Sequence, residues 1–467
     1  MKAARPRPGG GSFDAAAPAG RRDGGSAQEI GDAQRAIAAV WRIESAKVVA
    51  SVARLVRDVG LAEELAHDAL VSALEHWPDE GVPDNPGAWL MTAAKHRALD
   101  WLRQAALHAR KQEELGRDAD ARGDHLVPDI ADAVADAEGD VIGDDLLRLI
   151  FTACHPVLSP DARIALTLKL LGGLSTEEIA RAFLVSEPTV AQRIVRAKRT
   201  LGEAKVPFEV PAADALPERL ASVLEVVYAV FNEGYTGTRG DDWMRPALMH
   251  DALRLGRMLA ELARDNSEVH GLVALMELHA SRAAARIDDA GRPVLLTQQD
   301  RSRWDRLLIR RGLAALERAR ALAVAARRPL GPYALQAAIA ACHARAATAV
   351  DTDWPSIVAL YDALAQAIPT AVVQLNRAVA VGMAFGPEAA LEIVDGLRDD
   401  AALRDYQWLP SVRADLLGKL GRHDEACSEL MRAAELARNA RERELLLERA
   451  QAEAQGAQAG KRPNRLT

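Results

Sequence analysis

The segment between Leu174 and Leu201 holds the residues whose types and spacing point most clearly to a chemical role. Four bases and no acid fall between Pro188 and Thr200, and hydroxyl and amide side chains stand among them. Such donors on one helical face suit the major groove of DNA, where they bond base edges and phosphates. The predicted DNA-facing residues are Ser186, Thr189, Gln192, Arg193, Arg196, Lys198 and Arg199.

Two short helices must position these side chains. Ser175 and Glu178 have the spacing of a capping box, which predicts the start of the first helix. After a short turn over 184–186, Ser186 is expected to cap the second helix, with Pro188 in its first turn. The residues expected to pack are Ile179, Ala180, Phe183, Val190, Ile194, Val195 and Leu201. The pattern predicts a helix-turn-helix, and the alternative is a plain helical hairpin.

A second basic helix is predicted after Pro86. Lys95, Arg97 and Arg103 give it a basic face, with His96 and the edge of Trp101 beside them. Melted DNA requires cations for its phosphates and flat surfaces or pockets for its unstacked bases. This helix offers both, and the alternative is a solvated basic helix with structural tryptophans.

An acidic segment separates the two basic helices. Between Glu113 and Asp145 the chain has twelve acids and two arginines, which predicts a flexible linker. Before the first basic helix, apolar residues at helical spacing over 61–77 predict another helix, which the prolines after Trp77 are expected to end. The Gly-, Pro- and Ala-rich residues 1–32 are expected to form a disordered tail.

Composition narrows the classes of fold and function. The 467 residues are rich in Ala, Leu and Arg, and only 4% are aromatic, which favours an all-α fold. The net charge of −7 argues against nucleic-acid binding as a whole-chain value, so the local distribution of charge carries the prediction. Cys154, Cys342 and Cys427 lack ligand spacing and are interpreted as free thiols of a reducing cytosol.

Signs of other classes are missing from the sequence. The N-terminal residues lack the apolar stretch typical of a signal peptide, so none is expected, and the sequence has no apolar run of membrane-spanning length. We find no phosphate-binding loop, nucleophile motif or metal-ligand cluster, so we expect no enzyme, metal or cofactor. The paired acids Asp241-Asp242 and Asp288-Asp289 are interpreted as solvated loop residues.

The C-terminal part contains a weak repeat of 36 residues. Each unit has small residues before and after a turn at Gly386 or Gly421, a pattern typical of antiparallel helix pairs and close to the tetratricopeptide period of about 34 residues. The matching sets are Ala378, Val381, Ala390, Val394, Leu397 and Ala414, Leu417, Ala426, Leu430, Ala433. Ile357, Tyr361 and Leu364 are assigned to an earlier unit. The alternative is an ordinary helical bundle.

These motifs, in this order, resemble the extracytoplasmic-function (ECF) sigma factors of the sigma-70 family. The stretch 61–70, LAEELAHDAL, is similar to the family's region 2.2, and Trp89–Arg103 is similar to regions 2.3 and 2.4. The stretches 161–171 and 174–180 are similar to region 4. The resemblance covers about residues 33–204, and two residues depart from it. His67 stands where the family usually has Gln, and His96 where it often has Asn, which leaves the −10 preference open.

The resemblance implies a protein that binds core RNA polymerase and directs promoter-specific transcription initiation. It implies contacts with the β′ clamp helices through Glu64, Leu65, His67 and Asp68, and with the polymerase β flap through region 4. It assigns the −10 element to Trp89, Lys95, His96, Arg97, Asp100 and Arg103, and the −35 element to the helix-turn-helix. The linker is expected to thread the polymerase active-site cleft as an RNA mimic, with a solvated tether as the alternative.

The long C-terminal part resembles a sigma group with a tetratricopeptide-like extension and no evident anti-sigma gene, which implies control through the extension and a protein or ligand partner for it. The expected division is tail 1–32, region 2 over 33–110, linker 111–145, region 4 over 146–205 and a helical solenoid over 210–455. The expected location is the cytoplasm, at the nucleoid. The alternatives are an ordinary DNA-binding activator, which would not need the basic helix over 89–103, and an enzyme.

Overall fold

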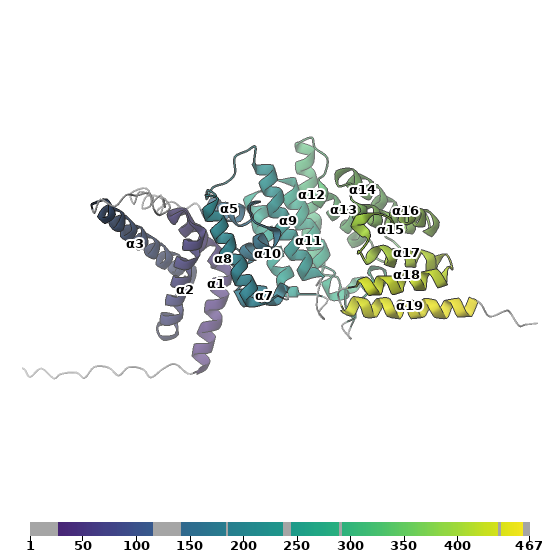
Figure 1. The fold of residues 1–467 in the computed structure, drawn as a ribbon, viewed down its shortest axis with the longest axis horizontal. Helices are drawn as coiled ribbons and strands as arrows, with labels where there is room; N and C mark the ends of the chain where they lie inside the picture. The colour runs from purple at the N-terminus through teal and green to yellow at the C-terminus, as the bar shows by residue number, and fades with distance from the viewer. Residues whose placement is uncertain are drawn as a thin grey trace, which may run out of the picture.

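The computed structural model describes residues 27–114, 142–183, 185–236, 244–288, 292–437 and 440–460. Residues 1–26 of the expected tail, most of the acidic linker, Leu184 of the turn, Asp241-Asp242, Trp243 and Asp289 lie outside the described residues. The tail prediction is wrong for residues 27–32, which form the start of the first helix. Eighteen α-helices make up the described part, which confirms the all-α prediction. Taken in groups, the helices run from the N-terminal part of the chain at one end of the long axis to the C-terminal part at the other (Figure 1).

Three helices form the N-terminal bundle: α1 (Ala27–Val56), α2 (Val59–Glu80) and α3 (Pro86–Glu114). Asp58 caps α2 by accepting a hydrogen bond from the Leu61 N–H at 2.8 Å. Helix α2 includes Pro78 and ends at Glu80, within the proline-rich segment that was expected to end it. A proline there removes one hydrogen bond, to the carbonyl of Leu74, whose side chain lies in solvent at the end of the helix. Helix α3 also continues four residues past the expected boundary at 110.

Four helices form the helix-turn-helix unit: α5 (Ile142–Ala153), α6 (Pro160–Leu170), α7 (Thr176–Phe183) and α8 (Glu187–Glu203). Helix α6 starts with Pro160 after Ser159, where the missing proline N–H leaves no intrahelical bond unmade. Its side chains are largely buried, since α8 packs on one side and neighbouring helices on others. The unit therefore presents α8 on its surface with α6 behind it.

The remaining helices form the extension. They are α9 (Leu216–Tyr235), α10 (Pro246–Leu262), α11 (Ser267–Ala280), α12 (Arg306–Ala325), α13 (Pro332–Arg345), α14 (Trp354–Ala367), α15 (Ala371–Phe385), α16 (Pro387–Gly396), α17 (Trp408–Lys419), α18 (His423–Leu436) and α19 (Ala440–Gly460). Four short 3₁₀ helices join them: η2 (Ala283–Ala285), η3 (Leu296–Gln298), η4 (Arg301–Arg303) and η5 (Ala401–Leu403).

The repeat lies in α15–α16 and α17–α18. Every residue of the two matching sets is buried except Leu397, which is half-buried. Gly386 and Gly421 occupy the turns with φ of 107° and 71°, a backbone region that favours glycine. Of the tryptophans of the extension, Trp304 is buried and Trp408 is 42% exposed. It stands at the first position of α17, where its neighbours cover only part of the ring.

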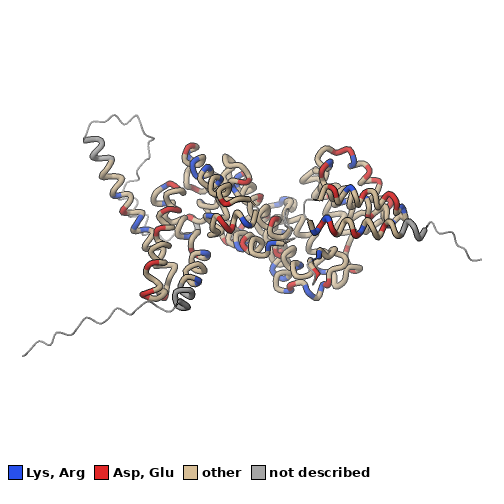
Figure 2. Tube along the Cα trace, turned by 60° about the horizontal axis from the view of Figure 1, so that its bottom comes forward, with Lys and Arg blue, Asp and Glu red and all other residues tan. Residues whose placement is uncertain are grey.

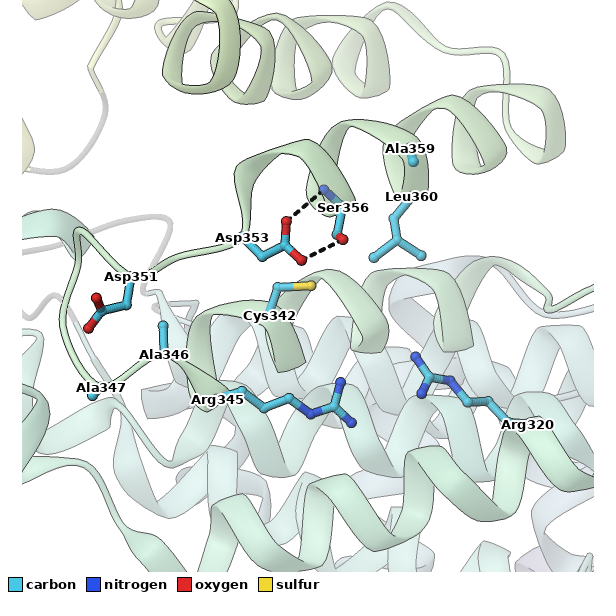
Figure 3. A pocket seen from close by; sticks show the side chains of 10 residues that line it. All are labelled: Arg320, Cys342, Arg345, Ala346, Ala347, Asp351, Asp353, Ser356, Ala359 and Leu360. Atoms are coloured by element: carbon cyan, nitrogen blue, oxygen red, sulfur yellow. Dashed lines mark hydrogen bonds between the residues drawn. The ribbon is translucent and has the colours of Figure 1, made fainter.

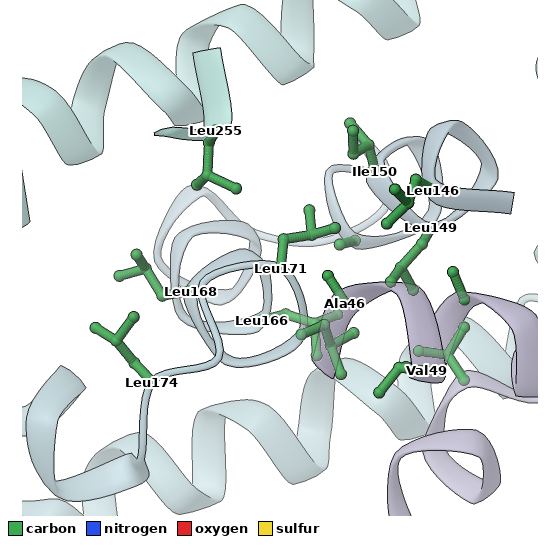
Figure 4. Close-up of a cluster of buried hydrophobic side chains, with 14 of the residues drawn as sticks. Ala46, Val49, Leu146, Leu149, Ile150, Leu166, Leu168, Leu171, Leu174 and Leu255 are labelled. Carbon is green, nitrogen blue, oxygen red and sulfur yellow. The ribbon is translucent and has the colours of Figure 1, made fainter. Parts of the chain in front are cut away.

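A single hydrophobic core joins the three parts. Side chains of α1, α5, α6 and α10 meet in it, among them Val49, Leu149, Leu166 and Leu255 (Figure 4). The same core continues into α9 and α11 of the extension. Gly173 precedes α7 and has a φ of 69°, and a β-carbon there would lie 2.8 Å from the Ser45 hydroxyl of α1. The N-terminal bundle and the helix-turn-helix unit are therefore in direct contact.

Candidate nucleic-acid interface

The helix-turn-helix is built by local hydrogen bonds at the start of each helix. The Glu178 N–H donates to the Ser175 hydroxyl at 3.1 Å, and the Ser175 N–H donates to the Glu178 carboxylate at 2.7 Å, which confirms the capping box. Ser186 occupies the N-cap of α8, and Pro188 lies in its first turn. The expected side-chain cap is absent, because the Ser186 hydroxyl bonds the Thr189 hydroxyl at 2.7 Å instead.

The outward face of α8 combines polar and apolar side chains. Gln192, Arg196 and Arg199 are exposed. Val195 was expected to pack, but it is 64% exposed and shares this face, since it lies three residues after Gln192 and four before Arg199. Its position on the exposed face was available from the helical spacing, which counted for less in the prediction than its apolar type.

Two bases of α8 are held by acids of other helices. Arg193 forms an ion pair with Asp161 of α6 at 3.0 Å. Lys198 forms an ion pair with Glu63 of α2, and Lys169 of α6 lies 3.7 Å from the same carboxylate. Glu63 is buried to a large extent, so its contacts with Lys198 and Lys169 face the interior of the molecule. Sequence reasoning missed the ion pairs of Glu63 and Asp161, because each acid meets a base on another helix that is distant in the chain.

The basic face of α3 is only partly open to solvent. His96 and Arg103 are exposed, and Arg103 pairs with Asp100 at 2.8 Å. Arg97 instead bonds the Ser72 hydroxyl of α2 at 2.6 Å, with Asp68 at 3.8 Å. Lys95 is half-buried. Because Arg97 ties α3 to α2, it serves the packing of the bundle as well as its surface charge.

The tryptophans of the bundle are packed to different extents. Trp89 is half-buried against Trp77, with ring centroids 5.4 Å apart in an edge-to-face arrangement. Trp101 is also half-buried and keeps part of its surface open. Trp89 therefore presents only part of its ring to a ligand, and its main contact is with the core.

The residues assigned to polymerase contacts lie on α2. Glu64, His67 and Asp68 are exposed on one side of this helix, and the His67 ring meets Trp41 edge to face. Leu65 is only 8% exposed and packs in the core, so it cannot take a polymerase contact in this conformation. Glu63, which binds Lys198, immediately precedes Glu64.

The extension completes the backbone hydrogen bonding of the helix-turn-helix unit. The last carbonyls of an α-helix have no partner within the helix. Arg219 of α9 donates to the carbonyl of Phe151 at 2.7 Å, and the Ser222 hydroxyl donates to the carbonyl of Cys154 at 2.7 Å, both at the end of α5. Arg254 of α10 donates to the carbonyls of Leu171 and Gly172 after α6.

One side chain of α1 meets both other parts of the molecule. Arg42 bonds the Asp251 carboxylate of α10 at 2.7 Å and lies 4.0 Å from the Glu178 carboxylate of α7. Asp251 is 5% exposed, so its charge is compensated inside the contact. A second interior pair, Arg54 of α1 with Asp145 of α5 at 2.9 Å, joins the N-terminal bundle to the helix-turn-helix unit.

Acidic and basic residues are interspersed over all three parts (Figure 2). Within the described ranges, no group of His, Cys, Asp and Glu residues has the arrangement of a metal site. No helix in the described part of the chain has the length and apolar character needed to span a bilayer. The three cysteines are free thiols, with Cys154 buried.

Comparisons with known proteins locate three family matches. Residues 43–107 match the model for sigma-70 region 2, and residues 148–201 match the model for sigma-70 region 4. Residues 219–320 match a family of unknown function (DUF6596). The two sigma matches cover the N-terminal bundle and the helix-turn-helix unit, and the third covers the first helices of the extension.

Several curated proteins are similar to this chain. An uncharacterized protein of Rhizobium meliloti (strain 1021) is 43% identical over 397 residues, which is 85% of this chain and 90% of that protein. The probable ECF RNA polymerase sigma factor SigI of Mycobacterium tuberculosis is 27% identical over 38% of this chain and 58% of its own length. The ECF RNA polymerase sigma factor SigK of Mycobacterium ulcerans is 29% identical over 33% of this chain and 78% of its own. No solved structure matches.

Proposed function

Because the chain belongs to the ECF sigma factors of the sigma-70 family, which direct RNA polymerase to promoters, we propose which helices perform each step and how the extension controls them. Helix α2 binds the polymerase β′ clamp helices through Glu64, His67 and Asp68. Helix α3 contacts the melted −10 element, and α8 enters the major groove of the −35 element. The protein is an initiation factor and not an enzyme, and it acts where polymerase and chromosome are, in the cytoplasm.

The exposed face of α8 supports its placement in the major groove. Gln192 and Arg196 supply donors for base edges and phosphates, and Val195 between them supplies an apolar contact for a thymine methyl group. Arg199, one turn further on, has the reach of a phosphate contact. Arg193 and Lys198 join this surface only when their acidic partners release them.

We propose that the described arrangement is a closed, inactive state of the sigma factor. A sigma factor of this type reads two separated DNA elements with two units, so the units must be free to take the spacing that the promoter sets. Here they are fixed to each other by a shared core and by interior ion pairs. The single observation that carries the proposal is Arg42, which binds the extension through Asp251 and lies beside Glu178.

The extension and the helix-turn-helix unit remain together in this proposal. Arg219, Ser222 and Arg254 satisfy carbonyls at the ends of α5 and α6, and loss of these bonds would leave buried polar groups unpaired. The contacts of α1 with α5 and α10 are the ones that separate on activation. A signal that favours the separated form shifts the population toward it. Deletion of the extension therefore removes activity, and loosening of its contact with α1 raises activity.

Reconstitution with core polymerase tests this proposal. Genomic fragments transcribed in vitro give the promoters, and transcript yield is then compared for the wild type, Asp251→Asn and the matched surface change Glu261→Gln. We expect Asp251→Asn to raise the yield severalfold, because Arg42 loses its charged partner, and Glu261→Gln to leave it unchanged. Lack of promoter-specific transcription by every variant would contradict the role assigned to α3 and α8. A yield lowered by Asp251→Asn would contradict the closed state alone.

A further inference from the structure

The extension contains a cavity of ≈ 720 Å³ between the ends of α12 and α13 and the start of α14. Its apolar lining consists of Cys342 of α13, Ala359 and Leu360 of α14, and Ala346 and Ala347 of the loop between the two helices. Two arginines, Arg320 and Arg345, line one side (Figure 3). The volume lies within the range of sites for small molecules, about 300–1,000 Å³.

The wall of the cavity is fixed by a buried arginine behind it. Arg301 of η4 is 8% exposed and donates to the carbonyls of His343 and Ala346 at 2.7 Å. It also donates to the Thr352 hydroxyl at 3.1 Å and lies over the ring of Trp304. These bonds hold both ends of the loop between α13 and α14, so the cavity is a preformed feature of the fold.

The acids at the cavity already have donors of their own. Asp353 caps α14, accepting from the Ser356 N–H at 3.0 Å and from the Ser356 hydroxyl at 2.6 Å. Asp351 accepts from the Thr348 N–H at 3.0 Å and from the Thr348 hydroxyl at 2.8 Å. The local bonds explain both carboxylates as turn and cap residues, and they do not require a ligand.

The arginines have donors left over. A guanidinium group carries five N–H donors. Arg320 donates to Glu317 at 2.9 Å, and Arg345 donates more weakly to the same oxygen at 3.4 Å. The two guanidinium groups point toward one another beneath Cys342 (Figure 3). Because both arginines bond the same Glu317 oxygen, most of the N–H donors of the two guanidinium groups remain available at the cavity that they line.

We propose that this cavity binds a small organic anion, with its carboxylate or phosphate group between Arg320 and Arg345 and its apolar body against Cys342 and Leu360. Planar guanidinium groups bind both oxyanions through paired hydrogen bonds. Binding at this site stands independently of the closed state, since the cavity lies wholly within the extension.

Cys342 supplies a direct readout, because a bound molecule would cover its thiol. The full-length protein is alkylated with N-ethylmaleimide at mildly alkaline pH, since burial raises the pKa of Cys342. Mass spectrometry of the cysteine peptides gives each rate. Cys427, half-buried on α18 away from the cavity, is the internal reference, and the buried Cys154 reports unfolding. The probes are benzoate, phenyl phosphate and the uncharged benzamide.

We expect benzoate or phenyl phosphate to slow alkylation of Cys342 severalfold without changing Cys427, and benzamide to have no effect. Comparison of the two anions distinguishes a carboxylate site from a phosphate site. Arg320→Gln and Arg345→Gln should each raise the protecting concentration about tenfold, through loss of a charge-assisted hydrogen bond. Arg311→Gln, an exposed change on the same helix, should not alter it. Equal protection by benzamide, protection unchanged in both cavity variants, or no protection by either anion overturns the proposal.

Discussion

Lys198 of the second helix of the helix-turn-helix forms an ion pair with Glu63 of α2, one residue before the predicted polymerase contact Glu64. A β-carbon at Gly60 would lie 3.6 Å from the Lys198 side chain, so the stem of this lysine rests against the start of α2. One contact therefore links the −35 reader to the polymerase-binding helix. In the closed state the two surfaces cannot move independently.

Removal of the Glu63 charge should release Lys198 to DNA. For Glu63→Gln we expect tighter binding of a −35 duplex and a steeper dependence of affinity on salt, since one more cation reaches a phosphate. Fluorescence anisotropy at several salt concentrations measures both. Glu75→Gln makes the same charge change at an exposed position of α2 and serves as the control. Identical salt slopes for both variants and the wild type would show that Lys198 does not reach DNA.

The Arg54–Asp145 pair should be costly to break and less costly to replace. Both side chains are nearly inaccessible, with 10% and 1% of their surfaces exposed, and Arg148 also bonds Asp145. Burial is the largest influence on Asp145 and raises its pKa, so the arginines only partly offset the desolvation. Loss of one partner from such a pair costs about 3–5 kcal/mol.

We therefore expect Asp145→Leu alone to lower the free energy of unfolding by about 3–5 kcal/mol, and Arg54→Met together with Asp145→Leu to lower it by much less. Urea denaturation of the four species of this double-mutant cycle measures the coupling. Additive effects of the two single changes would mean that the charges do not interact across the α1–α5 contact.

Arg196 is expected to contact the −35 element directly in both states of the protein, because it is exposed and forms no ion pair with an acid in the described part of the chain. Arg196→Ala should weaken binding by about 1–3 kcal/mol and relax specificity at one base pair if it contacts a base edge. Arg181→Ala, on the exposed face of α7, is the control. Binding of a set of single-base variants of the −35 sequence separates base readout from a phosphate contact, which would weaken all of them alike.

The part of the α3 basic face that is open to solvent, fully at His96 and Arg103 and partly at Lys95, should act on melted DNA. Lys95→Gln, His96→Gln and Arg103→Gln together leave the bond from Arg97 to Ser72 in place, so the bundle remains intact. We expect slower open-complex formation with little change in duplex binding, because these groups meet unstacked bases. Permanganate reactivity of promoter thymines follows the melting. Unchanged reactivity in this triple variant would remove α3 from the −10 contact.

Stability should fall on acidification because of a buried histidine. Burial, with Arg282 and Arg301 nearby, lowers the pKa of His343 from 6.5 to about 4. Between these values the unfolded chain takes up a proton that the folded protein does not, so the free energy of unfolding decreases as the pH falls. From about pH 7 to pH 5 the loss from this residue is on the order of 2 kcal/mol.

His343→Gln should reduce that dependence. The slope does not vanish, since burial also lowers the pKa of His279. Urea denaturation at several pH values gives the slope for each protein. A steeper decline in His343→Gln than in the wild type would contradict the assignment of a low pKa to His343.

The sequence was sufficient to predict those features whose determining interactions are local. The capping box at Ser175 and Glu178, and the repeat turns at Gly386 and Gly421, depend on residues a few positions apart, and the structure confirms them. The family assignment also follows from contiguous motifs, and the comparisons confirm it. The prediction was wrong at Val195, where the apolar residue type was followed in place of the helical spacing, and the spacing places this side chain in solvent.

Contacts between distant segments were beyond sequence reasoning. Arg301 bonds a carbonyl and a hydroxyl group within the extension, although its place in the sequence gives no sign of either partner. The contacts onto the helix-turn-helix unit come from Arg219, Ser222 and Arg254. An arginine on a helix surface gives no sign of which carbonyl it reaches, because that partner is set by the packing of whole helices.

The shared core has a consequence for building chimaeric regulators. The family match to region 4 ends at residue 201, which invites a gene fusion or a domain exchange just beyond α8. A junction there would remove the hydrogen bonds that α9 and α10 donate to carbonyls at the ends of α5 and α6. It would also expose the apolar face on which Val223 and Val227 pack. A junction directly after α11 would meet the same difficulty, because Ala274, Leu275 and Leu278 of α11 pack against α12 and α13 in a further core. A portable promoter reader must therefore extend beyond α11, well past the end of the family match to region 4.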